Sequence, residues 1–482
     1  MNNENIILLA DAYKYSHHKL YYPGTSKIYS YLESRGGMFD ETVFFGLQYY
    51  LKHYLEGQVI TKEKIDAAEQ TLQQVFGRDD VFDRTRFEYI LKEHNGRLPV
   101  VIKAVPEGTC VQVSNVLMTI ENTDPECFWL SNFLETLLMQ VWYPNTVATL
   151  SKHIRDTVEL YFTETASPEA MRLTDFVLND FGFRGVSSVE SAGLGGMAHL
   201  VNFNGSDNLM GSMFAQRYYS AEKVYGNSIP ATEHSVCTLL GEAGEPEVFK
   251  HILETFPAGT IACVSDSYNI FRACSEYWGD ELREQVLSRD GVLVIRPDSG
   301  DPVLTLLRVF TILFEKFGYT INEKGYRVLP KQVRVIQGDG INYESVHSIY
   351  SALKINGISA ENLVLGMGGA LLQKVDRDTQ KFAFKCSYAE INGKGVAVQK
   401  HPLEINGKGE LIQSFKTSKA GKLKLILTEE GYKTVGQNEA PEYKNQLITV
   451  FENGFLKNET TFGKVRAAAK NLNTTLWQAI IN

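Results

Sequence analysis

The chain has little of what marks an exported or membrane-bound protein. Its first ten residues hold an apolar run of only five, Ile6 to Ala10, which follows Glu4 and has no Lys or Arg before it. A signal peptide has a basic start and a longer apolar stretch. No segment approaches the ~18 consecutive apolar residues that a membrane helix needs. We therefore expect a soluble, cytoplasmic protein without a membrane partner.

Cysteine is scarce too. The six cysteines form no CxxC pair, and the histidines form no cluster along the sequence. This pattern argues against a structural zinc site and against a disulfide framework. A reducing cytoplasm is the simplest interpretation.

Positive charge is also in short supply. A formal net charge of -9 and a pI of about 5.7 disfavour non-specific nucleic-acid binding, which needs a basic face. Any phosphate must therefore be bound locally, in a focused pocket. What the chain does have is an ordinary globular composition, with 44% hydrophobic and 22% charged residues among 482. This length suffices for two domains or one large domain.

Both ends of the sequence have the pattern of antiparallel β-sheet. Across residues 98–120, short β-branched runs alternate with turn signals. The C-terminal part alternates similarly, and its dipeptides Asn392-Gly393 and Asn406-Gly407 are favoured in tight hairpin turns. We expect one discontinuous β-rich domain, made of residues 1–149, with some helices, and residues 381–482.

The middle, residues 150–380, has the pattern of repeated βα units. The helical segments between its apolar runs include one that begins with Asp301 as N-cap and Pro302 at the first helical position. Parallel βα barrels and doubly wound sheets bind ligands at the C-terminal strand ends, so we expect the loops that follow the strands to share one rim. The apolar runs interpreted as strands are 176–179, 261–264, 292–295, 333–336 and 363–365.

Acidic and basic residues gather in these loops. Asp266, Asp298 and Asp339 could bind ribose hydroxyls, hold Mg²⁺ or support positive charge on a sugar ring, or each could cap a helix. Arg184 and Arg296 suit phosphate oxygens, with a surface salt-bridge cluster as the alternative. Three carboxylates beside two arginines favour a site for a phosphorylated ribose compound.

Other features are open to two interpretations. The Gly-Met-Gly-Gly loop at 366–369 could bind an oxyanion through backbone N–H groups or be a tight turn. The similar glycines at 193–196 lie in a predicted helix and indicate close packing instead. His234 could bind phosphate, act as a general acid or accept a phosphoryl group, or be a buried hydrogen-bonded residue. Phe181 could stack on a flat ring, although its residue type alone favours the core.

Taken together, these residues resemble the nicotinate/nicotinamide phosphoribosyltransferase family of type II phosphoribosyltransferases. The likeness runs from Asp11 into the β-rich tail. The segments that carry it are TSKIYSY at 25–31, KAVPEG at 103–108, ENTDPEC at 121–127, DFGFRGVSS at 180–188, IRPDSG at 295–300 and RVIQGDG at 334–340.

The resemblance implies a fold and a reaction. Members of the family are similar in being homodimers with an irregular parallel α/β barrel and a β-rich domain, and in using phosphoribosyl pyrophosphate with Mg²⁺. The implied products are nicotinamide mononucleotide and pyrophosphate. Because the pyridine nitrogen would attack C1′ directly, the enzyme's tasks are to clamp the leaving group and stabilise the cationic sugar. The family also couples synthesis to ATP hydrolysis through a phosphorylated histidine, at the position of His234.

The resemblance also implies roles for particular residues. Phe181 would stack on one face of the pyridine ring, with Tyr13 of the partner subunit on the other. Asp207 would accept the carboxamide NH₂ and repel the carboxylate of nicotinate, which makes nicotinamide the preferred base. The remaining implied residues are Arg184, Arg296 and His234 at pyrophosphate; Asp298, Gly338, Asp339, Gly368, Gly369 and Arg377 at ribose and 5′-phosphate; Arg35, Lys385 and Lys400 across the dimer interface; and Asp11, Asp266 and Pro297 in the same site.

The sequence departs from the family pattern at several positions. Asn179, Phe183 and Ala383 stand where relatives have His, Tyr and Ser, and a second basic contact is not carried over onto Lys408. These changes bear on substrate affinity and the ATP-linked step more than on the reaction class. Two rival functions remain open: a nicotinate phosphoribosyltransferase, which Asp207 disfavours, and a non-catalytic binding or signalling protein on the same scaffold.

Overall fold

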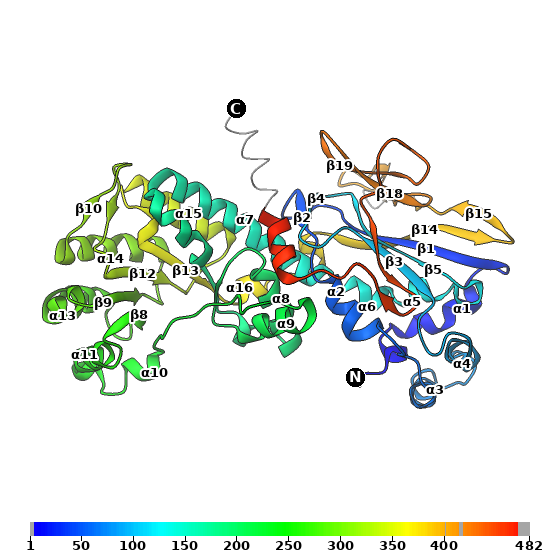
Figure 1. Ribbon diagram of the computed structural model, residues 1–482, viewed down its shortest axis with the longest axis horizontal. Helices are drawn as coiled ribbons and strands as arrows, with labels where there is room; N and C mark the ends of the chain where they lie inside the picture. The colour runs from blue at the N-terminus through cyan, green and yellow to red at the C-terminus, as the bar shows by residue number, and fades with distance from the viewer. Residues whose placement is uncertain (1–3, 401, 414–417, 471–482) are drawn as a thin grey trace. The chain divides into compact units, whose positions relative to one another are not determined.

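Figure 1 shows the computed structural model of the chain, which describes residues 4–400, 402–413 and 418–470. The chain forms two compact units. Unit 1 comprises Met1–Thr146, Arg217–Ser220 and Asp376–Asn482, and unit 2 comprises Val147–Gln216 and Ala221–Val375. The observed boundaries near 146 and 376 lie within a few residues of the expected ones at 149 and 381. The short return of the chain at 217–220 has no counterpart in the sequence expectation.

Unit 2 is built on a six-stranded sheet whose pairs are all parallel. Four of the five expected apolar runs are strands, extended by one to three residues because neighbouring residues continue the ladder. The fifth, 176–179, is a strand only from Leu178, because Phe176 ends the 3-10 helix η5 (Pro168–Phe176). The strands, in sheet order, are β7 (Gly205–Ser206), β6 (Leu178–Asp180), β13 (Leu363–Met367), β12 (Val333–Gln337), β9 (Asp290–Arg296) and β8 (Ala258–Val264).

An irregular segment closes this sheet into a barrel. Asn227 forms a parallel bridge to Gly205 on β7, and Ala231 forms one to Ala262 on β8, at the opposite edge. The segment between them therefore satisfies backbone groups of both edge strands, as an edge of a sheet requires. This connection makes the barrel irregular, in agreement with the expected fold class.

Helices surround the strands of unit 2 (Figure 1). In α14 (Pro302–Phe317), the Asp301 carboxylate accepts a hydrogen bond from the Leu304 N–H, which confirms the predicted cap. Leu306, Phe310 and Leu313, spaced along one face of the helix, are buried. The other helices of this part of the chain are α7 (Trp142–Thr165), α8 (Val189–His199), α9 (Leu209–Tyr219), α10 (His234–Cys237), α11 (Glu245–Thr255), α12 (Ile270–Arg272), α13 (Arg283–Leu287), α15 (Tyr343–Ile355) and α16 (Gly369–Leu372).

The glycines at 193–196 are a packing face, as predicted. They lie within α8, where a Cβ on Gly193 would come within 2.6 Å of the Phe214 ring of α9. A Cβ on Gly211 of α9 would similarly lie 2.6 Å from the Gly196 carbonyl carbon. The two helices therefore approach too closely for any side chain at these positions.

Unit 1 contains a seven-stranded antiparallel sheet. Helices α5 (Leu130–Phe133) and α6 (Glu135–Met139) pack against it, and Figure 1 shows the hairpin of β18 (Leu423–Thr428) and β19 (Gly431–Gly436) on the other side. The N-terminal and C-terminal segments therefore share one sheet, as the alternating patterns predicted. Its strands, in order, are β15 (Lys394–Ala397), β14 (Phe382–Ile391), β1 (Thr25–Ser34), β5 (Val116–Asn122), β3 (Val100–Ala104), β20 (Ile448–Glu452) and β21 (Phe455–Leu456).

One of the two predicted tight turns differs from expectation. Asn392 and Gly393, between β14 and β15, both have positive φ (50° and 72°), as a two-residue hairpin turn requires. In the hairpin of β16 (Leu403–Ile405) and β17 (Leu411–Gln413), positive φ instead occurs at Gly409. There the Asn406 side chain accepts the backbone N–H groups of Lys408 and Glu410, which stabilises a longer turn.

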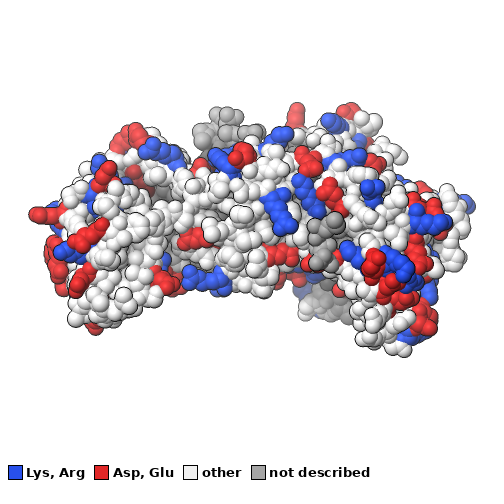
Figure 2. All heavy atoms as spheres, turned by 60° about the horizontal axis from the view of Figure 1, so that its bottom comes forward, with Lys and Arg blue, Asp and Glu red and all other residues white. Residues whose placement is uncertain are grey.

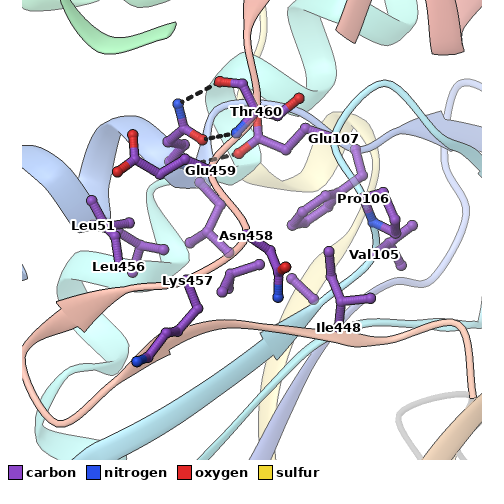
Figure 3. Close-up of a pocket in the computed structure, with 15 residues that line it drawn as sticks. Leu51, Val105, Pro106, Glu107, Ile448, Leu456, Lys457, Asn458, Glu459 and Thr460 are labelled. Atoms are coloured by element: carbon purple, nitrogen blue, oxygen red, sulfur yellow. Dashed lines mark hydrogen bonds between the residues drawn. The ribbon is translucent and has the colours of Figure 1, made fainter. Parts of the chain in front are cut away.

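A cavity of about 150 Å³ lies in unit 1, where apolar residues such as Leu51, Val105 and Ile448 line it (Figure 3). Glu107 borders this cavity, and its carboxylate accepts hydrogen bonds from the N–H groups of Gly46 and Gln48 and from the Tyr219 hydroxyl. Burial raises the pKa of Glu107. The Glu107 carboxylate therefore accepts backbone N–H groups at the N-terminus of α2 (Leu47–Tyr50). None of the predicted site residues lines this cavity.

On the face that Figure 2 shows, acidic and basic side chains lie interspersed among larger uncharged areas. Within the described ranges, no helix is both long and apolar enough to cross a membrane.

Candidate active site

The C-terminal strand ends of unit 2 surround a cavity of about 640 Å³. The loops that follow β7, β6, β13, β12 and β9 all line this cavity, as the βα pattern predicted. The predicted site residues that line it are Phe181, Arg184, Asp207, Arg296, Asp298, Gly338, Asp339, Gly368 and Gly369; Asp180, Phe183, Gly185 and Asn208 complete the lining.

Phe181 stands half-buried between this cavity and the barrel interior. Its ring lies against the backbone of Gly366 on β13, where any Cβ would overlap the ring, and 3.6 Å from the position a Cβ would take on Gly338. The backbone N–H of Phe181 donates to the Met367 carbonyl at 3.0 Å. Residue type alone favoured the core for Phe181, and its ring does pack against the buried residues Ala262, Val294 and Ile336, while it also borders both cavities.

Asp207 follows β7 and is exposed to the cavity. Its carboxylate accepts a hydrogen bond from the Ser228 hydroxyl, on the segment that closes the barrel. Its backbone N–H donates to the Asp180 carbonyl at 3.0 Å. A carboxylate thus faces the same space as the Phe181 ring, and sequence reasoning alone had not identified Ser228 or Asp180 as its supports.

A hydrogen-bond network connects His234 with the loop after β9. His234 Nε2 lies 2.9 Å from Asp266 Oδ1, and Asp266 Oδ2 accepts the Asp298 N–H at 3.1 Å and the Ser299 hydroxyl at 2.6 Å. The Asp266 side chain is only 4% exposed, whereas that of His234 is 48% exposed. His234 is therefore an accessible imidazole at the start of α10, oriented by a buried carboxylate, and the alternative of a buried histidine is wrong.

Charges of both signs meet at Asp298. Burial raises the pKa of Asp298, nearby Arg296 and His234 lower it, and Asp266 and Asp339 raise it. Arg296 Nη2 lies 3.7 Å from Asp298 Oδ2, while Arg296 Nε is buried and has no hydrogen-bond partner among the described residues. A partly unsatisfied guanidinium beside a group of carboxylates is suited to an anionic ligand that also carries a cation or hydroxyls.

The glycine loop lies beside these charges. Gly368 and Gly369 follow β13 at the start of α16, and a Cβ on Gly369 would meet nothing within 4 Å. Backbone N–H groups there are accessible from the cavity, so the loop can approach a phosphate closely. Pro297 is buried between Arg296 and Asp298 and fixes the backbone that carries them.

A second, mainly apolar cavity of about 450 Å³ occupies the barrel interior. Phe181, Asp207 and Arg296 border both cavities, and Asn179 lines the inner one. Asn179 donates to the carbonyls of Phe176 and Leu365. One of the three departures from the family pattern therefore lies inside the barrel, while Phe183 lines the outer cavity and Ala383 lies buried on β14.

The predicted basic residues of the β-rich domain gather in unit 1. Burial lowers the pKa of Lys385, nearby Glu135 raises it, and Arg35, Lys400 and Arg377 lower it further. Arg35 Nη2 is buried and has no hydrogen-bond partner among the described residues, although its Nε donates to Glu33 at 2.7 Å. These four cations lie near acidic side chains as well, because Arg35 pairs with Glu33 at 2.7 Å and Arg377 with Asp378 at 3.0 Å.

The two remaining predicted residues are in the N-terminal segment of unit 1. Tyr13 is 59% exposed, and its ring contacts the His17 ring edge-on, with 5.0 Å between the centroids. The Asp11 carboxylate accepts the Thr136 hydroxyl at 2.8 Å, and Asp11 is the N-cap residue of η2 (Ala12–Ser16). Both residues therefore lie on the surface of unit 1.

A group of potential metal ligands outside the rim is His94, Asp124 and Cys127, whose ligand atoms all lie within 4.8 Å of one another. His94 Nε2 and the Tyr89 hydroxyl contact Asp124 Oδ2 at 2.6 and 2.9 Å, and the Glu126 N–H donates to Oδ1. Burial, followed by the charge of Asp124, raises the pKa of Cys127 to about 12. Asp124 is the N-cap residue of η4 (Pro125–Cys127), and this structural role explains why the three side chains lie together.

A parallel α/β barrel with arginines, carboxylates and glycines on one rim, combined with an antiparallel sheet from both chain ends, defines a type II phosphoribosyltransferase architecture. Two family models match the chain. The nicotinate phosphoribosyltransferase (NAPRTase) family matches residues 176–454, and the N-terminal domain of nicotinamide phosphoribosyltransferase matches residues 5–102. The chain belongs to the nicotinate phosphoribosyltransferase family.

Curated relatives match nearly the whole chain. It is 44% identical over 474 residues to a nicotinamide phosphoribosyltransferase of Xanthomonas campestris pv. campestris, covering 97% of this chain and 98% of that one. It is 32% identical to a nicotinamide phosphoribosyltransferase of Acinetobacter baylyi, covering 95% of each chain.

Solved structures share the fold. A nicotinate-nucleotide pyrophosphorylase from Pyrococcus furiosus superposes with a TM-score of 0.59 at 15% identity, covering 98% of this chain and 96% of that one. The human nicotinic acid phosphoribosyltransferase gives 0.52 at 17% identity, covering 96% and 93%. At these identities the likeness concerns the fold alone.

Proposed function

We propose that this protein is a nicotinamide phosphoribosyltransferase, which transfers the phosphoribosyl group of phosphoribosyl pyrophosphate to nicotinamide in NAD salvage. The observation that carries the proposal is the 44% identity, over 97% of the chain, to a relative of that name. The products are nicotinamide mononucleotide and pyrophosphate. The rim cavity supplies the chemical groups that this reaction needs.

The base is read by Phe181 and Asp207. The ring of Phe181, backed by Gly366, offers a flat face for the pyridine, and the Asp207 carboxylate offers an acceptor for the carboxamide NH₂. Nicotinate carries a carboxylate in place of the amide, and this would face Asp207 as a like charge. Tyr13, on the surface of unit 1, is proposed to cover the other face of the base from the partner subunit.

The remaining rim residues bind the sugar and its phosphates. Arg184 and Arg296 clamp the pyrophosphate that leaves, while Asp298 and Asp339 accept ribose hydroxyls and stabilise positive charge on C1′. The Gly368-Gly369 loop receives the 5′-phosphate. Arg35, Lys385, Lys400 and Arg377, grouped in unit 1, are proposed to add phosphate contacts in a homodimer with shared sites.

Mg²⁺ and ATP are the proposed cofactor and cosubstrate. Asp266 uses both of its oxygens in hydrogen bonds, so Asp298 and Asp339 are the carboxylates that fit a hard cation. There the cation would neutralise charge on the pyrophosphate as it leaves. For ATP coupling, the exposed imidazole of His234, oriented by Asp266, accepts the γ-phosphoryl group as ADP leaves, and water later releases phosphate. We also propose a cytoplasmic location.

The experiment incubates the purified protein with nicotinamide and phosphoribosyl pyrophosphate, with and without ATP, in the presence of Mg²⁺. Nicotinamide mononucleotide and pyrophosphate are measured in parallel. Equal amounts of both products, formed faster with ATP, are expected. No mononucleotide in either condition would refute the activity, while equal rates with and without ATP would refute only the coupling.

A further inference from the structure

The side chain of Asp180 is completely buried at the C-terminal end of β6. It precedes Phe181 in the chain, and its neighbours across the sheet are β7 and β13. Its Oδ1 accepts the backbone N–H of Gly182 at 2.7 Å, and its Oδ2 accepts an amide N–H of Asn208 at 2.9 Å. Both oxygens are therefore occupied by protein donors.

These two hydrogen bonds hold the loops after β6 and β7, which carry the two residues proposed to bind the base. Gly182 immediately follows Phe181, whose own N–H is fixed by the Met367 carbonyl at 3.0 Å. Asn208 immediately follows Asp207, whose N–H donates to the Asp180 carbonyl at 3.0 Å. One residue thus contacts the chain next to the stacking ring and next to the recognition carboxylate.

Asn208 extends the connection to a helix. Its amide also donates to the Ala192 carbonyl of α8 at 2.8 Å, and its own N–H donates to the Ser206 hydroxyl at 3.1 Å. The Asn208 Oδ1 atom is buried and has no partner among the described residues, so the amide is oriented by what it donates. The Asp180 carboxylate is therefore one of the acceptors that hold the loop after β7 in place.

We propose that Asp180 is a positioning residue for the base, which sets the spacing between the Phe181 ring and the Asp207 carboxylate; this inference rests on the proposed function. An ionised carboxylate accepts both N–H donors strongly, whereas a protonated carboxyl has one weaker acceptor oxygen, which carries the O–H. Burial raises the pKa of Asp180 to about 6, and Asp207 is the charged side chain that raises it further, so the group remains largely ionised at neutral pH.

Asp180→Asn tests this role with almost no change of shape. The new amide oxygen can still accept from Gly182, but the new NH₂ group faces the NH₂ of Asn208. Loss of a hydrogen bond to a charged group should raise the KM for nicotinamide about tenfold. The KM for phosphoribosyl pyrophosphate should change less, by about threefold at most, because only Arg184 of its proposed ligands lies on the loop after β6 that Asp180 holds. The others lie on the loops after β9, β12 and β13.

Two further variants complete the experiment. Asn208→Ala removes the donor at the other end of the same contact and should raise the KM for nicotinamide by a similar factor. This variant still tests the proposal if Asp180→Asn fails to fold. Asn362→Ala is the matched control, because Asn362 is also fully buried and bonds Leu329, Arg327 and Ser359 at the opposite end of β13. It should lower stability while leaving both KM values unchanged.

The outcomes separate this inference from the proposed function. If the wild-type protein makes no nicotinamide mononucleotide, the proposed function fails. If the wild type is active, a rise in the nicotinamide KM confined to Asp180→Asn and Asn208→Ala supports the positioning role. Unchanged nicotinamide KM values would overturn it, and so would equal increases for both substrates or the same change in Asn362→Ala, because these indicate general destabilisation.

Discussion

His234 Nε2 lies 2.9 Å from Asp266 Oδ1, and the other oxygen of the same carboxylate accepts the backbone N–H of Asp298. The histidine proposed to be phosphorylated and the aspartate proposed to stabilise the ribose are therefore connected through one buried side chain. This connection gives a structural route by which phosphorylation of His234 could reach the ribose end of the site.

The first prediction concerns this histidine. His234→Ala should abolish the stimulation of turnover by ATP, while the ATP-independent reaction should remain within about tenfold of wild type, because pyrophosphate still meets two arginines. Initial rates with and without ATP provide the measurement. An ATP stimulation equal to that of wild type would show that His234 does not carry the coupling.

Asp298→Ala should lower kcat by about 100-fold or more, because a carboxylate that supports charge in the transition state is removed. Thermal unfolding should show an intact fold. The matched control is Asp301→Ala, three residues further on, which removes the N-cap of α14 and should cost about 1 kcal/mol of stability with little effect on kcat. Near-normal turnover of Asp298→Ala would mean that the ribose is bound elsewhere.

Gly366→Ala should weaken binding of the base through sterics alone. A Cβ at this position overlaps the Phe181 ring, which must then move from its place at the rim. The KM for nicotinamide should rise by about tenfold or more, a cost of at least 1.4 kcal/mol. Gly407→Ala is the control, because a Cβ there meets nothing within 4 Å. Wild-type kinetics of Gly366→Ala would contradict the role of the ring.

Glu245 provides a prediction of stability. It is fully buried at the start of α11, neither of its carboxylate oxygens has a hydrogen-bond partner among the described residues, and burial raises its pKa to about 7. A carboxyl whose pKa is raised on folding destabilises the folded state increasingly as pH rises from about 4.5, and fully above pH 7.

Glu245→Gln should therefore raise the free energy of unfolding by about 1–3 kcal/mol at pH 8 and change it little at pH 4.5. Denaturant unfolding at the two pH values measures the difference. A stabilisation of equal size at both pH values, or a loss of stability at pH 8, would contradict a destabilising buried charge.

Asp207→Ala should erase discrimination between the two bases. Removing the carboxylate removes both the acceptor for the amide and the like charge that disfavours nicotinate, so the ratio of kcat/KM for nicotinamide over nicotinate should fall by about 10-fold to 100-fold. Separate kinetics with each base give the ratio. If the ratio remains at its wild-type value, Asp207 does not select the base.

Much of the fold was predictable because it depends on local patterns. The alternating segments and the helix that begins at Pro302 have periodicities and caps that identify them, and the loops after the parallel strands had to share a rim. The closure of the barrel through Asn227 and Ala231 was not predictable, because isolated bridges leave no periodicity in the sequence. The prediction of a tight two-residue turn at Asn406-Gly407 was wrong, because the Asn406 side chain accepts two backbone N–H groups and stabilises a longer loop.

The sequence indicated which residues line the candidate site, but not the buried residues that hold them in position. Arg296, Asp298 and Asp339 stood out because charged residues directly follow apolar strands. Asp180 follows a strand too, yet nothing in the sequence indicates that its carboxylate points into the protein and bonds Asn208. The place of the Phe181 ring likewise depends on Gly366, nearly two hundred residues away, which only the folded sheet brings to the ring.

The most direct test of nicotinamide phosphoribosyl transfer is a competition in one vessel. Equal concentrations of nicotinamide and nicotinate are supplied with limiting phosphoribosyl pyrophosphate, Mg²⁺ and ATP, and the two mononucleotides are quantified by mass spectrometry. Nicotinamide mononucleotide should predominate, with pyrophosphate equal to the sum of both products. Predominance of nicotinate mononucleotide would contradict the proposed substrate, and absence of both would contradict the reaction itself.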